Sequence, residues 1–245
     1  FAGGLVVHTT AGISALVIAK ALGSRNGFPK SVNPPHSPVI AMIGAALLWV
    51  GWFGFNAGSA LAANENAAMA MLVTHISAAA ATITWMLIDW YKNGKPGLVG
   101  MITGMVAGLA TVTPASGFIG PLGGLILGVS SGVICYWFVG YVKTFLNIDD
   151  SLDVFAVHGV GGILGTLLCG LLATGSFGGM GLESSVWDQT KVQIIGVVSI
   201  ALYTFIVTSI IVMITQKVVG LRVPEQEENR DGLDLGSHGE SSYHL

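Results

Sequence analysis

The feature that most constrains this chain is a series of apolar runs, each close to the length that crosses a bilayer. A helix of about 20 apolar residues spans the hydrocarbon core of a membrane. Apolar residues make up 52% of the chain and charged residues 9%, with a mean hydropathy of +0.74, whereas soluble domains carry about 25% charged residues. We predict seven spans, at roughly 3–22, 38–60, 67–90, 97–113, 118–142, 154–173 and 192–216.

The predicted fold class is therefore an all-α integral membrane protein, a polytopic helix bundle. Residues 1–219 are predicted to form the transmembrane domain and residues 220–245 a polar tail, which composition alone predicts to be solvated, with or without fixed structure. The chain begins at Phe1 rather than Met, and an apolar run starts within about two residues of it. We expect that further helices precede it in a longer protein.

Basic residues predict the orientation, because Lys and Arg are retained on the cytoplasmic side of a membrane. In the predicted topology Lys191 lies on one side and all other basic residues lie on the opposite side. These are Lys20, Arg25, Lys30, Lys92, Lys95, Lys143, Lys217, Arg222 and Arg230. The C-terminus is therefore predicted to be cytoplasmic, and the first span to enter from outside.

Three histidines, His8, His75 and His158, fall inside predicted spans, where ionisable groups are costly. One such histidine is more often a hydrogen-bonded structural residue than a functional one. His8 and His158, however, both follow a Phe-Ala sequence, in spans that run in opposite directions, as corresponding helices of an inverted-topology repeat do. We expect the two rings to face each other near the membrane centre and to share a proton, which suits a small nitrogen hydride.

The position of His158 along its helix conflicts with this expectation. Counted from Ser151 at 1.5 Å per residue, His158 lies only about 10 Å along the helix, short of the membrane centre. The conflict disappears if the helix begins deep in a vestibule, with Asp149, Asp150 and Asp153 at the inner mouth. The alternative is that these carboxylates are ordinary helix caps at the interface.

The second predicted span carries aromatic and small residues over 52–59, a sequence that can form a gate or simply pack in a core. Aromatic rings such as Trp52 and Phe55 can close an apolar pore and attract a cation through their faces. Cys135 and Cys169 lie inside apolar runs without the spacing of a metal site, so we expect two core residues, no metal and no cofactor.

Several motifs in order resemble the bacterial-type ammonium transporter (Amt) family over nearly the whole chain. They are Phe1-Ala2-Gly3-Gly4 with Val7-His8, the stretch Gly51–Ser59, Gly94-Lys95-Pro96, Val112-Thr113-Pro114-Ala115, Asp153-Val154-Phe155 with Val157-His158-Gly159, and Gly220-Leu221-Arg222-Val223-Pro224. The span count fits the later part of the family's usual eleven helices.

This resemblance implies a homotrimer in the cell (inner) membrane, in which each subunit has a narrow apolar pore. His8 and His158 match the twin histidines inside that pore, and Phe55 the inner phenylalanine of its outer gate. Trp52 matches a pore-lining tryptophan and Ser59 a hydroxyl of the outer recruitment site. Ammonium would be recruited outside, deprotonated and conducted inward as ammonia, with Asp150 and Asp153 at the inner mouth; His75 matches no functional position.

The resemblance also implies a partner, since the family's tail helps to form the docking surface for a PII-type signalling protein. Membrane lipids are expected partners, and nucleic acid is not. An ammonium sensor that signals through its tail is the alternative. An intramembrane enzyme is disfavoured because the two histidines lack an intramembrane carboxylate or a third ligand, and a sodium-coupled carrier of an organic solute remains open from hydropathy alone.

Overall fold

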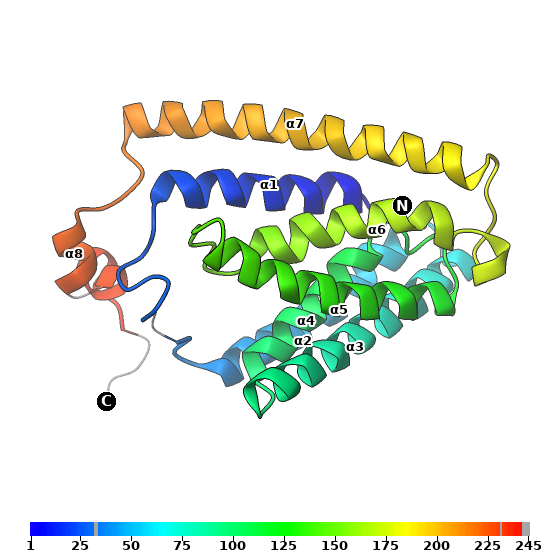
Figure 1. Ribbon diagram of the computed structural model, residues 1–245, viewed down its shortest axis with the longest axis horizontal. Coiled ribbons are helices and arrows are strands. Elements are labelled where there is room, and N and C mark those ends of the chain that lie inside the picture. Colours follow the sequence, from blue (N-terminus) through cyan, green and yellow to red (C-terminus); the bar gives the residue numbers. More distant parts are fainter. Residues whose placement is uncertain (32–33, 231, 242–245) are drawn as a thin grey trace.

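The computed structural model describes residues 1–31, 34–230 and 232–241, and over these residues it is helical with no strand. The long helices are α1 (Gly4–Leu22), α2 (Pro38–Gly58), α3 (Glu65–Asn93), α4 (Leu98–Val112), α5 (Pro121–Thr144), α6 (Gly161–Leu172) and α7 (Val186–Val218). A π-helix, η1 (Phe155–Val160), leads into α6, and a 3-10 turn, η2 (Gly175–Phe177), follows it. The tail carries α8 (Glu225–Arg230) and η3 (Asp234–His238), as Figure 1 shows.

Local sequence signals account for several helix ends. Ser37 caps α2 by accepting a hydrogen bond from the Ile40 amide at 3.3 Å, and Pro38 suits the first turn because it lacks an amide proton. Asn64 caps α3 through the Ala67 amide at 3.0 Å. That helix ends at Gly94, whose φ of 74° is in the left-handed region that favours glycine.

Six of the seven expected spans are helices long and apolar enough to cross a membrane, and the fourth differs. α4 has 15 residues, about 22 Å of helix, which is short of a hydrocarbon core of about 30 Å. The chain then continues as a turn in which Thr113, Ala115 and Ser116 are fully buried. Irregular backbone is tolerated at membrane depth where protein covers it, and hydropathy alone does not indicate this burial.

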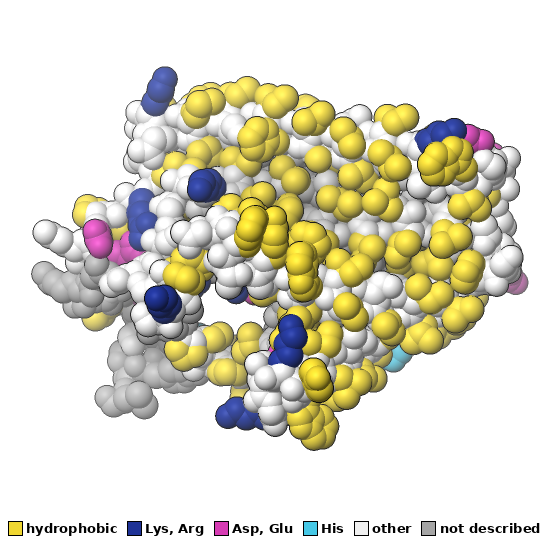
Figure 2. All heavy atoms as spheres, in the orientation of Figure 1, with side chains coloured by type: hydrophobic (Ala, Val, Ile, Leu, Met, Phe, Trp, Pro, Cys, Tyr) yellow, Lys and Arg dark blue, Asp and Glu magenta, His cyan; other side chains and the backbone are white. Residues whose placement is uncertain are grey.

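The bundle has a packed centre and long helices around it. α3, α4 and α5 pack against one another, α2 covers α3 and α4, and α7 runs along α1 and α6 (Figure 1). Figure 2 shows a largely hydrophobic face over α5 and α7, with Lys and Arg side chains mostly at the end of the bundle where α8 lies. Apolar residues face outward because lipid, not water, is the expected surrounding.

α1, which carries His8, runs antiparallel to η1, which carries His158, and to α6. A Cβ on Gly12 would enter the backbone of Gly159, and a Cβ on Gly162 would lie 2.7 Å from the His8 Cβ. The later residue of α1 thus meets the earlier residue of the partner segment, so the two segments run in opposite directions. α1 continues for about 21 Å beyond His8 before it ends at Leu22. η1 consequently begins deep within the bundle, which removes the conflict over the depth of His158.

Candidate functional site

The centre of the candidate site is a pair of imidazole rings brought together by the crossing of α1 and η1. The Nδ1 atoms of His8 and His158 lie 3.1 Å apart, and the ring centroids are 5.1 Å apart at an interplanar angle of 28°. His8 is buried and His158 is partly buried. The expected contact between these two histidines is therefore present.

The ring geometry restricts the protonation of the pair. A hydrogen bond between two Nδ1 atoms needs one that donates and one that accepts, so two neutral rings must be in opposite tautomers. The two Nε2 atoms then differ as well, one carrying a proton and the other a lone pair. His8 Nε2 is buried without a hydrogen-bond partner in the described structure. This atom can therefore form a hydrogen bond with a small molecule that enters the site.

Two aromatic residues of α2 complete a stack of rings around His8. The Trp52 ring lies 5.4 Å from the His8 ring at 15°, and Phe55 meets the edge of Trp52 at 5.8 Å and 88°. Phe55 is 38% exposed, whereas Trp52 is 7% exposed. The structure thus brings the Trp52 and Phe55 rings to His8, and Phe55 is the more exposed of the two.

Trp52 has an anchor that the sequence analysis did not single out. Its Nε1 donates a hydrogen bond of 2.9 Å to Thr113 Oγ1, and Thr113 donates in turn to the Leu109 carbonyl at 2.7 Å. Both side chains are buried. The Val112-Thr113-Pro114-Ala115 motif marks Thr113 in the sequence. It does not indicate Trp52 as the partner, because Trp52 lies 61 residues away.

Ser59 lies one helical turn beyond Phe55, at the end of α2, and does not contact the histidines directly. Its hydroxyl donates to the Phe55 carbonyl at 2.8 Å. A hydroxyl oxygen keeps acceptor capacity after it donates. Ser59 can therefore accept a hydrogen bond from a cationic N–H group, one helical turn beyond Phe55, whose ring contacts that of His8.

The three aspartates expected at the inner mouth have separate roles. Asp150 accepts a hydrogen bond of 2.7 Å from the Phe155 amide and so caps η1, while Asp149 receives hydrogen bonds of 2.7 and 2.8 Å from the Arg25 side chain. These bonds hold the pKa of Asp149 below its usual range. Asp153 pairs with Lys143 at 2.7 Å, and burial raises its pKa against the opposing effect of Lys143.

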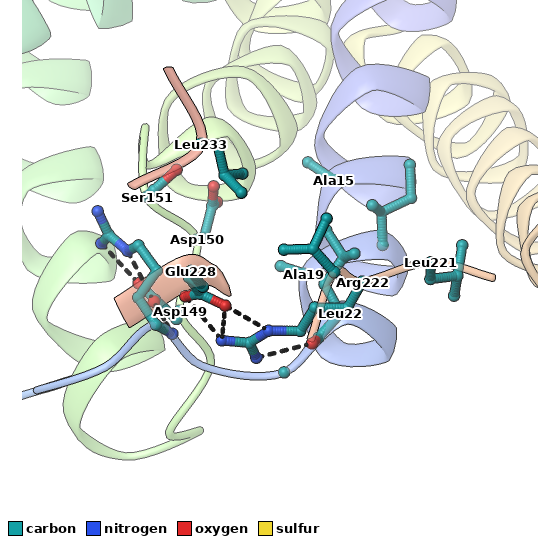
Figure 3. A pocket seen from close by; sticks show the side chains of 14 residues that line it. Ala15, Ala19, Leu22, Asp149, Asp150, Ser151, Leu221, Arg222, Glu228 and Leu233 are labelled. Carbon is teal, nitrogen blue, oxygen red and sulfur yellow. Dashed lines mark hydrogen bonds and ion pairs between the residues drawn. The ribbon is translucent and has the colours of Figure 1, made fainter. Parts of the chain in front are cut away.

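A cavity of about 530 Å³ lies at this end of the bundle, at the C-terminal end of α1 and beyond His8 along that helix. Asp149 and Asp150 line it, whereas Asp153 does not (Figure 3). Asp150 thus caps η1 and also lines this cavity, while the placement of the carboxylates at an inner mouth stays a prediction. Tail residues Arg222, Glu228 and Leu233 line the other wall, so the described tail is folded against the bundle.

The remaining candidates lie away from the pair. His75 is exposed, with its ring 5.2 Å from that of Trp49 and 6.1 Å from that of Phe53, and it contacts neither His8 nor His158 through any ring or hydrogen bond found in the described residues. Cys135 and Cys169 are buried free thiols. The described part of the chain contains no group of three or more side chains that could hold a metal ion.

The fold and the buried imidazole pair define a polytopic helical membrane protein with a polar site inside an apolar bundle. The profile of the Ammonium Transporter Family matches residues 1–243. The chain belongs to that family, whose named members are transporters rather than enzymes.

Relatives and solved structures agree with this assignment. The chain is 48% identical to a putative ammonium transporter of Methanothermobacter thermautotrophicus, over 100% of the chain and 60% of the relative. It is 46% identical to ammonium transporter Amt1 of Archaeoglobus fulgidus, over 99% and 62%. The chain thus spans about three fifths of these relatives' length.

Among solved structures, a sensor Amt protein superposes with a TM-score of 0.87 at 32% identity, over 95% of this chain and 58% of that one. Candida albicans Mep2 superposes with a TM-score of 0.83 at 35% identity, over 93% and 53%.

Proposed function

We propose that this chain forms the pore-bearing part of an ammonium transporter that recruits ammonium outside, deprotonates it and conducts ammonia inward. The observation that carries the proposal is the contact between His8 and His158 at 3.1 Å inside an apolar bundle. Opposite tautomers present one Nε2 donor and one Nε2 acceptor. Ammonia has both a lone pair and N–H groups, so it can bond to each of them in turn.

Recruitment is assigned to the outer side of α2. Ser59 offers a hydroxyl oxygen to an ammonium N–H group, and the faces of aromatic rings attract a cation. Phe55 forms the inner part of the gate and contacts the His8 ring. Trp52 lines the pore and stacks on the His8 ring. A cation that passes this gate loses its water, and this favours release of a proton.

Selectivity follows from the cost of charge in an apolar path. Burying an unpaired ion costs far more than burying a neutral polar molecule that keeps its hydrogen bonds. Potassium resembles ammonium in size and charge but cannot lose a proton to become neutral. The histidine pair takes part in relaying the proton released by ammonium.

The proposed orientation has the C-terminus in the cytoplasm of a cell with the protein in its inner membrane. The basic residues support it, because they gather at the end of the bundle where α8 lies (Figure 2). Asp150 and Asp153 then lie on the inner side of His158. We assign residues 1–219 to the transmembrane domain and residues 220–245 to the cytoplasmic tail, a division supported by the end of α7 at Val218.

A homotrimer and a PII-type partner at the cytoplasmic face are part of the proposal and rest on family resemblance. The folded tail, with Arg222 bonded to the carbonyls of Leu22 and Ser24 at 3.1 and 2.9 Å, offers a defined surface for such a partner. The sensor alternative has the name of one structural neighbour in its favour. No feature of the described residues favours it over transport.

The test is current across proteoliposomes that contain the full-length protein, after an ammonium pulse and after a potassium pulse. We expect the wild type to respond to ammonium and not to potassium. The double variant His8→Ala, His158→Ala should lose the response to ammonium or its selectivity over potassium. His75→Ala is the matched control, since His75 lies in a span but outside the pair, and it should behave as the wild type.

Two results contradict the proposal. A wild-type protein that gives no response to the ammonium pulse indicates a sensor or an unrelated carrier. A double variant that keeps both current and selectivity shows that the histidine pair is not the selective element.

A further inference from the structure

A ladder of parallel aromatic rings lies on the outer face of α5, near its C-terminal end. The Trp137 and Tyr141 centroids are 5.3 Å apart at 16°, and those of Tyr141 and Phe145 are 4.9 Å apart at 19°. Trp137 is 58% exposed and Phe145 is 73% exposed. The spacing of four residues puts all three rings on one stripe of the helix.

A lysine from a neighbouring helix stands beside this ladder. Lys92, in the last turn of α3, has its Nζ 4.8 Å from the centre of the Tyr136 ring. No carboxylate forms a salt bridge with Lys92 in the described structure, although Asp153, Asp149, Asp188 and Glu228 each pair with another basic residue. Asp89, one turn earlier, accepts a hydrogen bond from Asn93 and lies beside the Tyr136 hydroxyl.

The ladder and the lysine border one cavity of about 270 Å³, which we call the Lys92 groove. Its lining consists of Lys92, Tyr136, Trp137, Gly140, Tyr141, Thr144 and Phe145. A Cβ on Gly140 would meet no atom within 4 Å, so the floor of the groove is open there. The groove therefore combines a lysine that forms no salt bridge among the described residues with two exposed rings, Trp137 and Phe145.

The place of the groove identifies the chemistry of an occupant. Tyr and Trp rings prefer the level of lipid headgroups, and this end of the bundle carries most of the basic side chains (Figure 2). In the proposed orientation it faces the cytoplasmic leaflet, which contains anionic lipids that attract Lys and Arg. Charge complementarity thus favours a phosphate-bearing anion whose other end is apolar.

We propose that the Lys92 groove binds an anionic phospholipid of the cytoplasmic leaflet. The Lys92 ammonium contacts the headgroup phosphate, and the rings of Trp137, Tyr141 and Phe145 contact the glycerol backbone and the first methylenes of an acyl chain. This inference uses the orientation proposed above but is independent of which solute crosses the pore.

The test measures quenching of Trp137 fluorescence by lipids brominated near the headgroup. The full-length protein is reconstituted in phosphatidylcholine vesicles with increasing fractions of brominated phosphatidylglycerol or brominated phosphatidylcholine. Subtracting the signal of Trp137→Phe isolates Trp137 from every other tryptophan of the protein, including the other five of the 6 in this chain. We expect half-quenching at about a fivefold lower fraction of phosphatidylglycerol than of phosphatidylcholine, the effect of one lysine near an anionic headgroup.

Variants of Lys92 separate charge from packing. Lys92→Gln should abolish the fivefold preference while phosphatidylcholine still quenches Trp137, and Lys92→Arg should retain it, which keeps the test valid if the glutamine variant does not fold. Lys217→Gln, on the same side of the membrane at the end of α7, is the control and should keep the preference.

Three results overturn the proposal. Equal quenching by the two lipids in the wild type means that the groove does not select charge. A preference that persists in Lys92→Gln assigns it to another residue. Absence of quenching by either lipid means that protein, such as a second copy of the chain, covers the ladder.

Discussion

Gly12 of α1 and Gly159 of η1 lie in main-chain contact, and a Cβ on Gly12 would enter the Gly159 backbone. Gly159 follows His158 directly, and Gly12 lies one helical turn after His8. This crossing therefore holds the two rings at their separation of 3.1 Å between Nδ1 atoms. No rotamer change can relieve a clash at this point, because only backbone atoms are involved.

The first prediction is that Gly12→Ala separates the histidine pair. The added methyl group forces α1 away from η1, at a cost of about 1–3 kcal/mol typical of overpacking. We expect a lower melting temperature and a reduced ammonium current in proteoliposomes. Gly51→Ala is the control, since a Cβ there meets no atom within 4 Å. If the two variants carry equal currents, the crossing does not set the geometry of the pair.

The second prediction concerns the anchor of Trp52. Thr113→Val keeps the shape of the side chain but removes the acceptor of the Trp52 Nε1 bond. A buried donor left without a partner costs about 1–3 kcal/mol, and the Trp52 ring loses its fixed position on His8. We expect reduced thermal stability and weaker selectivity for ammonium over potassium. Thr113→Ser retains the hydroxyl and should restore both; equal behaviour of the two variants would exclude the hydrogen bond as the cause.

The pairing of His8 with His158 could be predicted from the sequence, because span parity and a shared Phe-Ala sequence both point to it. Trp52 and Phe55 were recognisable from the resemblance to the family. The anchor Thr113 was not, since a hydroxyl in an apolar helix usually bonds to its own backbone, as Thr113 does with Leu109. Its additional bond depends on the packing of α2 against α4.

Two other features depend on tertiary structure in a similar way. Arg25 was informative for topology only, because nothing local indicates that its partner Asp149 lies 124 residues away. The short length of α4 depends on the burial of the following turn, which hydropathy does not report. In both cases the deciding fact is which segments cover a polar group.

The third prediction concerns the ion pair of Arg25 with Asp149, which joins the loop after α1 to the segment before η1. The Arg25 side chain is 45% exposed and that of Asp149 is 1% exposed. Arg25→Gln leaves the carboxylate buried without its cation, and we expect a loss of about 2 kcal/mol, less than the 3–5 kcal/mol of a fully buried pair because water screens the arginine. The measurement is the melting temperature of the wild type and variant in detergent.

The pH dependence of this difference identifies its source. The pKa of Asp149 is lowered in the folded protein by the Arg25 hydrogen bonds. The stabilisation is therefore fully present above the unfolded pKa of about 3.9 and is lost as pH falls through the lower folded pKa. Wild type and Arg25→Gln should differ by a constant amount from pH 5 to 8 and converge only in strong acid. Convergence already near pH 6 would assign the effect to a different group.

The fourth prediction is that Arg222 fastens the tail to the bundle. Its guanidinium bonds Glu228 through Nε and Nη2, each at 2.9 Å, and the same side chain reaches the carbonyls of Leu22 and Ser24 at the end of α1. Lysine has one compact ammonium group and cannot form this fork. In Arg222→Lys we expect amide hydrogens of residues 225–228 to exchange about fivefold to tenfold faster, measured by mass spectrometry of the tail peptide.

The comparison variant for the tail is Glu225→Gln, which removes one charge from α8 at a residue that forms no salt bridge in the described structure. It should leave exchange unchanged, because the fork and the carbonyl contacts remain. If Arg222→Lys also leaves exchange unchanged, packing of Leu233 into the wall of the cavity at the end of α1 is sufficient to hold the tail. If both variants exchange faster, the net charge of the tail matters rather than the geometry of the arginine.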